Sequence, residues 1–128
     1  MEWVRGYIGL PFRERGRDRT GVDCWGLVRL VYAERLGIVL PGYEEYASTV
    51  DREAIPGLID AGCRRWTRVE SARVFDVAVF DIHGRPMHVG LVLDEARMLH
   101  VERGKDACIE RYDGSRWAPR LEGIYRHV

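Results

Sequence analysis

The sequence predicts an α+β fold in which a buried N-terminal helix packs on an antiparallel β-sheet. The first half of the chain contains a helical stretch, residues 24–36, that is apolar on nearly all sides. The second half consists of short β-rich runs separated by Gly, Pro and Asp. Helices followed by strands, without alternation between the two, are typical of α+β proteins.

The first half predicts two helices and two loops. Residues 1–22 predict a short helix followed by a loop rich in Gly and Arg. Residues 24–36 predict a helix that ends near Gly37, and we place it at the centre of the fold because a helix that is apolar all round is usually buried. Residues 41–50 predict a loop, and 51–62 a weaker helix interrupted by Pro56.

The second half predicts five strands, at residues 74–82, 87–93, 98–103, 108–112 and 121–127. The second and third of these form a hairpin through the three-residue loop 94–96. An odd loop pairs Leu93 with Arg97, so His100 lies across from Gly90 and diagonal to His88. An even loop would instead place the two histidines on opposite faces of the sheet.

Length and composition indicate one globular domain, residues 1–128. Apolar residues make up 46% and charged residues 31%. Lys plus Arg equals Asp plus Glu at 20 each, which gives no support to nucleic acid or an anionic membrane as the main partner. No apolar run is long enough for membrane insertion. The N-terminus lacks the order of a signal peptide, so we expect synthesis in the cytoplasm without export by that route.

Three cysteines at wide spacing, Cys24, Cys63 and Cys108, predict neither a disulfide framework nor a metal site, and no cofactor is expected. Cys24 begins the central helix, where free N–H groups and the helix dipole favour a thiolate nucleophile. Asp23 stands at the N-cap position, and its charge would partly oppose that effect. The alternative interpretation is that Cys24 is a small buried apolar residue.

The two hairpin histidines complete a catalytic arrangement. Both have apolar neighbours on either side, so both point away from an apolar face. His88 would act as the base for Cys24, His100 would orient His88, and the Cys24 N–H would bind the oxyanion. Each histidine taken alone is more often structural than catalytic.

Four stretches of the chain resemble the NlpC/P60 cysteine peptidases. These stretches are residues 23–28 (DCWGLV), 76–80 (DVAVF), 88–93 (HVGLVL) and 99–100 (LH). The resemblance implies a papain-like fold, with Cys24 as nucleophile, His88 as base and His100 as the third polar residue. It also implies cleavage of a peptidoglycan stem peptide, typically between γ-D-glutamate and diaminopimelate.

Residues 9–12 and 23–29 resemble the branch of this family found in tailed phages and prophages. That resemblance implies association with phage tail proteins in a virion and action on the cell wall, or alternatively a tail assembly protein with weak or no peptidase activity. A thiol acyltransferase or amidase is a third possibility.

The surroundings of the substrate and the oxyanion are expected to include Asp23, Trp25, Phe12 and Tyr43. Phe12 stands where many relatives have a tyrosine, so the hydroxyl that such a tyrosine would give the oxyanion site is missing. Tyr7 or Tyr43 would be needed to replace it.

Overall fold

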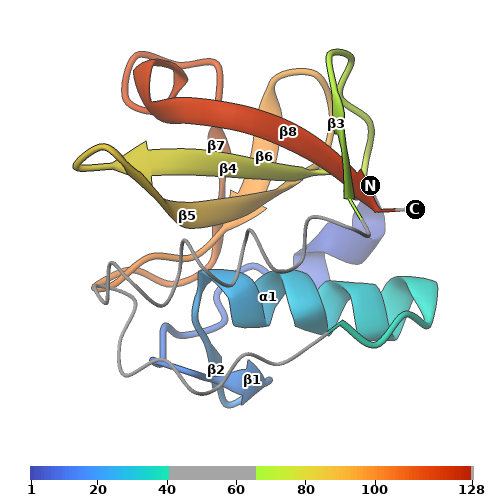
Figure 1. Cartoon of the computed structure of the whole chain (residues 1–128). Helices are drawn as coiled ribbons and strands as arrows, with labels where there is room; N and C mark the ends of the chain where they lie inside the picture. The colour runs from blue at the N-terminus through green and yellow to red at the C-terminus, as the bar shows by residue number, and fades with distance from the viewer. Residues whose placement is uncertain (41–65, 128) are drawn as a thin grey trace.

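The computed structural model describes residues 1–40 and 66–127 (Figure 1). The predicted loop 41–50 and helix 51–62 lie outside these residues, as do Tyr43 and Cys63. Within the described part, one helix packs against an antiparallel sheet, which confirms the predicted α+β class. No helix in these ranges is long and apolar enough to cross a membrane.

The central helix, α1 (Cys24–Val31), continues into a π-helical turn, η2 (Tyr32–Leu36). It ends where Gly37 takes the left-handed conformation at φ 68°, which glycine adopts without a Cβ penalty. The predicted bounds of the helix are therefore confirmed. Its burial is confirmed only in part, because residues 33–37 are exposed.

The main sheet has six strands, all antiparallel, in the order β3-β8-β4-β5-β6-β7. Their bounds are β3 (Trp66–Val69), β4 (Val77–Ile82), β5 (Arg85–Val92), β6 (Arg97–His100), β7 (Cys108–Arg111) and β8 (Leu121–His127). Five correspond to predicted strands, and β3 was not predicted. β4 begins three residues later than expected because Phe75 has a φ of 75°, which is incompatible with an extended strand.

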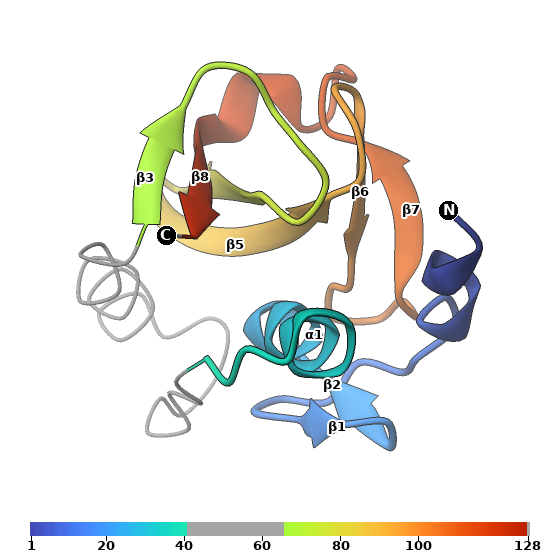
Figure 2. The same cartoon turned by 90° about the vertical axis from the view of Figure 1, so that its right-hand side faces the viewer.

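The sheet curls, and α1 packs on its convex side against β5 (Figure 2). The cluster between them includes Leu27 and Val28 of the helix, Val89 and Leu91 of β5, and Leu99 of β6. A second buried cluster fills the concave side and includes Phe80, Met98, Tyr112 and Trp117. Alternate residues of β5 and β6 therefore face two different cores.

The N-terminal segment forms a 3-10 helix, η1 (Glu2–Gly6), and a small hairpin of β1 (Arg17–Asp18) and β2 (Gly21–Val22). The hairpin replaces part of the predicted loop. Two of its arginines have structural partners: Arg17 pairs with Asp23 at 2.9 Å, and Arg19 pairs with Glu34 at 2.6 Å. These contacts tie the hairpin to both ends of the central helix.

Candidate active site

Cys24 is the first residue of α1 and is 6% exposed. Within the described part of the chain, no hydrogen bond engages its backbone N–H. The first N–H groups of a helix have no partner inside the helix. The N–H that the sequence predicts as the oxyanion donor thus has no other partner among the described residues.

Asp23 is the N-cap of α1 and is fully buried. Its Oδ1 accepts hydrogen bonds from the Gly26 N–H at 2.7 Å and from Arg17 at 2.9 Å, and its Oδ2 accepts one from the Arg15 N–H at 3.0 Å. The predicted N-cap is confirmed. Both oxygens of the carboxylate are held by the helix and the β1–β2 hairpin, so Asp23 fixes the position of the helix start.

The Cys24 sulfur lies beside the peptide that joins His88 to Val89. Burial raises the pKa of the Cys24 thiol to about 12, the Asp23 charge adds to this, and the N–H groups of Val89 and Trp25, which face the sulfur, only partly offset it. The expectation that the helix N-terminus favours a thiolate is therefore wrong for the free protein. Desolvation outweighs the helix dipole, so the sulfur is a thiol at neutral pH.

The contact with the Val89 N–H places the sulfur at an edge of β5. Strand N–H groups lie in the plane of the sheet, between its two faces. Between β5 and β6, only two residue pairs are formed: Leu91 of β5 pairs with Leu99 of β6, and Val92 pairs with Met98. The sulfur thus approaches β5 next to His88, although His88 points toward the concave face.

The β5–β6 hairpin has the predicted register. Leu91 pairs with Leu99, which puts His100 across from Gly90. His88 Nε2 and His100 Nδ1 are 2.9 Å apart, and the two residues are 5% and 1% exposed. A Cβ at Gly90 would collide with Met98 Sδ, so the glycine makes room for Met98.

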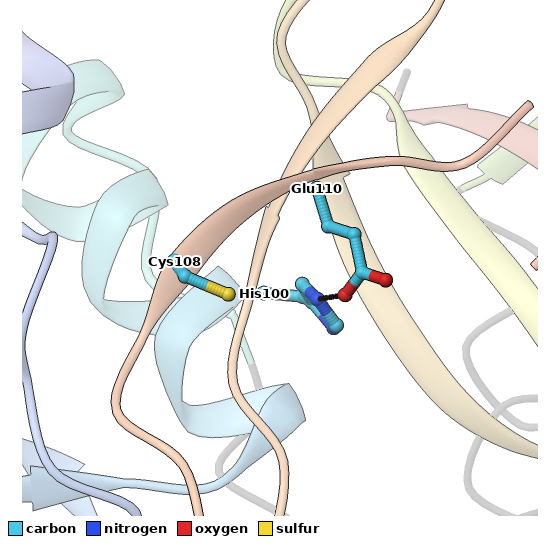
Figure 3. A group of neighbouring side chains, drawn as sticks. All are labelled: His100, Cys108 and Glu110. Carbon is cyan, nitrogen blue, oxygen red and sulfur yellow. Dashed lines mark hydrogen bonds and ion pairs between the residues drawn. The ribbon is translucent and has the colours of Figure 1, made fainter. Parts of the chain in front are cut away.

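Glu110 of β7 extends the histidine pair. Its Oε1 lies 2.9 Å from His100 Nε2 (Figure 3). Arg116 Nη1 lies 3.2 Å from the same oxygen. Burial raises the pKa of Glu110, but Trp117, His100 and Arg116 outweigh it, so the pKa is lowered and the group is a carboxylate at neutral pH. Arg116 also binds both oxygens of Glu102 at 2.7 Å.

This carboxylate determines which ring nitrogens carry protons. Burial lowers the pKa of His88 to about 3 and also lowers that of His100, so both rings are neutral at pH 7. A carboxylate only accepts hydrogen bonds, so His100 donates from Nε2 and accepts at Nδ1. His88 must then donate from Nε2, which leaves its Nδ1 free to accept a proton.

Trp117 holds the His88 ring from the side. The two rings stack at 4.9 Å with an interplanar angle of 19°, and Phe80 lies 5.9 Å from His88. The Trp117 N–H helps to lower the pKa of Glu110, although no acceptor among the described residues meets hydrogen-bond geometry with it. Trp117 therefore packs on both histidines.

Glu110 and Trp117 were not predicted as site residues. Both come from segments later in the chain than the hairpin, so no local motif links them to His100. The alternation of side chains along β7 could have indicated Glu110. Cys108 and Glu110 point inward on the same face of the strand, while Ile109 and Arg111 are more exposed.

The other predicted site residues lie at the margins of this arrangement. Trp25 is half-buried and packs edge-on against Trp66 at 6.5 Å. Phe12 is half-buried, forms a bridge with Val22, and lies under Arg103 at 5.6 Å. Neither makes a described contact with the histidines.

Tyr7 does not replace the hydroxyl that Phe12 lacks. Its hydroxyl donates to Glu34 at 2.7 Å. Glu34 is ten residues after Cys24, which is about 15 Å along a helix. Burial and Glu34 raise the pKa of Tyr7 to about 12, which is consistent with a structural role at the far end of the helix.

Two relatives align with nearly the whole chain. The gamma-DL-glutamyl hydrolase of Bacillus subtilis strain 168 is 28% identical over 123 residues, which are 94% of this chain and 27% of that protein. The murein DD-endopeptidase MepS/murein LD-carboxypeptidase of Escherichia coli K12 is 21% identical over 126 residues, which are 98% of this chain and 60% of that protein. The chain thus spans less than two thirds of either relative.

Solved structures share the fold. The NlpC/p60 domain of the peptidoglycan hydrolase SagA has a TM-score of 0.67 at 21% identity, covering 96% of this chain and 92% of that one. An NlpC/P60 family protein from Bacillus cereus ATCC 10987 has a TM-score of 0.74 at 19% identity, covering 98% and 38%. The family model for NlpC/P60 matches residues 9–126. By fold and by sequence, the chain belongs to the NlpC/P60 family.

Proposed function

We propose that this chain is a cysteine hydrolase that cleaves an amide bond in peptidoglycan stem peptides. The observation that supports the proposal most strongly is the hydrogen-bonded series His88–His100–Glu110, which begins on β5 one residue before Val89, whose N–H faces the Cys24 sulfur. A neutral imidazole with one free acceptor nitrogen next to a thiol at a helix N-terminus is what nucleophilic catalysis by cysteine requires.

In the proposed mechanism, His88 Nδ1 takes the thiol proton while the sulfur attacks the amide carbon. The high pKa of Cys24 means that this proton moves as the C–S bond forms, since no thiolate is present beforehand. The C–N bond then breaks, and the leaving amine takes the proton from His88. Water, deprotonated by the same nitrogen, hydrolyses the thioester and restores the thiol.

His100 and Glu110 act on the base in this scheme. The His100 Nδ1 lone pair keeps the His88 proton on Nε2, so Nδ1 stays available. When His88 becomes an imidazolium, the positive charge is stabilised through His100 by the Glu110 carboxylate. Glu110 is therefore a positioning residue in this mechanism.

The oxyanion forms next to the start of α1, where the Cys24 N–H is the proposed donor. The structure describes no tyrosine hydroxyl at this place, because Tyr7 binds Glu34 and position 12 is phenylalanine. We therefore expect this chain to hydrolyse its substrate more slowly than it would with a second hydrogen-bond donor to the oxyanion.

The proposed bond joins γ-D-glutamate to diaminopimelate. The B. subtilis relative is named a gamma-DL-glutamyl hydrolase and the E. coli relative a murein endopeptidase and carboxypeptidase. Both names describe hydrolysis of bonds that belong to bacterial wall or γ-glutamyl peptides, and the resemblance at residues 23–28 and 88–93 supports the same substrate class here.

The test is digestion of purified muropeptides, with products identified by liquid chromatography and mass spectrometry. The wild type should release fragments cut at one stem-peptide bond, Cys24→Ala should release none, and Cys108→Ala should match the wild type. Cleavage by Cys24→Ala at the wild-type rate would end the proposal. Transfer of the acyl group to an amine in place of water would favour an acyltransferase.

We also propose that the protein is a component of a phage or prophage tail, on the resemblance of residues 9–12 and 23–29 to that branch of the family. Purified particles analysed by mass spectrometry should contain the chain. The absence of a tyrosine at position 12 favours one alternative, a tail assembly protein with little activity. If Cys24→Ala particles assemble normally but wild-type protein leaves muropeptides uncut, that alternative is correct.

A further inference from the structure

We propose that His100, Cys108 and Glu110 form a zinc-binding site whose occupation switches off the hydrolase. The binding part of the proposal stands on the geometry of β6 and β7 alone. The inhibitory part rests on the function proposed above, because His100 belongs to both sites.

The three side chains are brought together by strand register. His100 pairs directly with Cys108 across β6 and β7, and Glu110 follows Cys108 by two residues, so all three point to one face. One ligand atom from each lies within 4.8 Å of the other two. Figure 3 shows the sulfur and the carboxylate flanking the His100 ring.

The ligand types match zinc. Imidazole nitrogen, thiolate sulfur and carboxylate oxygen are its ordinary protein ligands, at about 2.0–2.3 Å from the metal. Tetrahedral ligands at such distances are roughly 3.5 Å apart, so the group must tighten by about 1 Å. β7 is the edge strand, and Cys108 and Glu110 are only half-buried, so such a movement disturbs no paired strand beyond them. Three protein ligands leave a fourth position for water.

Arg116 would compete with a metal ion for the Glu110 carboxylate. It lies 3.2 Å and 3.3 Å from the two Glu110 oxygens, so it opposes a cation there. Its stronger contact is with Glu102, at 2.7 Å to both oxygens. Arg116 can therefore release Glu110 to a metal and stay paired with Glu102. Zinc also has to displace the thiol proton of Cys108, which passes to solvent.

Zinc at His100 Nε2 would reverse the hydrogen bonds of the histidine pair. The metal takes the lone pair of Nε2, so the single proton of the neutral His100 ring must sit on Nδ1. That nitrogen would then donate to His88 Nε2, which must accept. The His88 proton would move to Nδ1, the nitrogen that has to receive the thiol proton. The base would be lost without any change in the position of Cys24.

Metal binding is measured with cobalt(II) as a spectroscopic substitute for zinc, on the whole chain. Wild type and Cys24→Ala should each bind one ion with a thiolate-to-cobalt charge-transfer band, and zinc should displace it. Cys108→Ala should lose the band and bind at least about 10-fold more weakly. A band that disappears in Cys24→Ala and persists in Cys108→Ala would place the metal at the nucleophile and overturn the proposal.

Turnover provides the second measurement. Zinc should inhibit the wild type reversibly, with recovery on adding a chelator, and Cys108→Ala should keep wild-type activity and resist the same zinc concentration. Equal sensitivity of the two proteins would refute the inhibitory role. Cys108→Ser, with near-ultraviolet circular dichroism to verify folding, replaces Cys108→Ala if the alanine variant is unstable. If no turnover is found in any variant, the proposed function fails, and the cobalt measurement still decides the metal site.

Discussion

The two halves of the site are both buried, and burial disfavours charge in both, but the carboxylate next to each half acts in the opposite direction: Asp23 adds to the effect of burial on Cys24, and Glu110 opposes it at His100. On the helix side, Cys24 is desolvated and lies next to the Asp23 carboxylate, so a negative sulfur is disfavoured. On the sheet side, His88 is also desolvated, but the hydrogen-bonded series from it ends at Glu110, whose side chain is 29% exposed. The thiol and both imidazoles are therefore neutral in the free protein, but only the histidine series has a carboxylate that offsets part of the cost of a positive charge.

Removal of the base should have the largest effect. In His88→Ala, no group takes the thiol proton as the C–S bond forms, and kcat/KM should fall by about 10²–10⁴-fold. His83→Asn is the matched control, because His83 is exposed in the β4–β5 turn at φ 54°, a conformation that asparagine tolerates. A loss below about tenfold in His88→Ala, with the fold intact by circular dichroism, would contradict the role of His88.

The neutral histidines should make the protein sensitive to acid. The folded-state pKa of His88, about 3, lies below the ordinary value of 6.5, so the unfolded chain binds the extra proton first. This stabilisation is complete above pH 6.5 and is lost as the pH falls toward 3. By pH 4 the loss amounts to about 3 kcal/mol.

Urea unfolding between pH 7 and pH 4 measures this loss. As the pH is lowered from 7 to 4, the free energy of unfolding of the wild type should decrease. It should decrease less in His88→Phe, which places an apolar ring against Trp117. A wild-type unfolding free energy that is constant over this range would contradict a neutral His88. For the same reason, kcat/KM should show no acid limb near pH 6.5 from His88.

Glu110→Gln should have a smaller effect, mainly on kcat. The neutral amide can still accept from His100 Nε2, but it no longer stabilises the positive charge that develops on the histidines. A hydrogen bond to a charged group contributes about 1.5–3 kcal/mol, so a fall in kcat of roughly 10–100-fold is expected. Glu122→Gln is the control, because Glu122 binds Tyr125 instead. An effect confined to KM would show that Glu110 contacts substrate.

The smallest expected effect is an increase in kcat. Phe12→Tyr adds a hydroxyl to a half-buried ring at a solvent-accessible place, and one more neutral hydrogen bond to the oxyanion is worth about 0.5–1.5 kcal/mol. We therefore expect kcat to rise by roughly two- to tenfold, with little change in melting temperature. An unchanged kcat would show that position 12 does not reach the oxyanion.

The hairpin shows what the sequence could predict. Its loop length alone fixed the register that brings His88 and His100 within 2.9 Å, because side-chain alternation leaves only two choices. Glu110 and Trp117 could not be predicted in the same way, since their positions depend on how β7 and the chain after it fold over the hairpin. The short strand β3 was missed because four residues carry too weak a pattern.

The protonation state of Cys24 was wrongly predicted for a related reason. Helix position is readable from sequence, and it favours the thiolate. The extent of burial around the sulfur and the orientation of the Asp23 charge are properties of the packed structure, and together they outweigh the dipole. The helix start identified the candidate nucleophile, and the tertiary structure determines its charge.

The most direct test of the account is to trap the covalent intermediate. Wild-type protein is mixed with a slowly hydrolysed γ-D-glutamyl peptide, quenched in acid, and analysed by intact mass spectrometry with peptide mapping. We predict an acyl adduct on Cys24 that is absent in Cys24→Ala and strongly reduced in His88→Ala. An adduct on Cys108, or peptide cleavage by Cys24→Ala at the wild-type rate, would contradict the account.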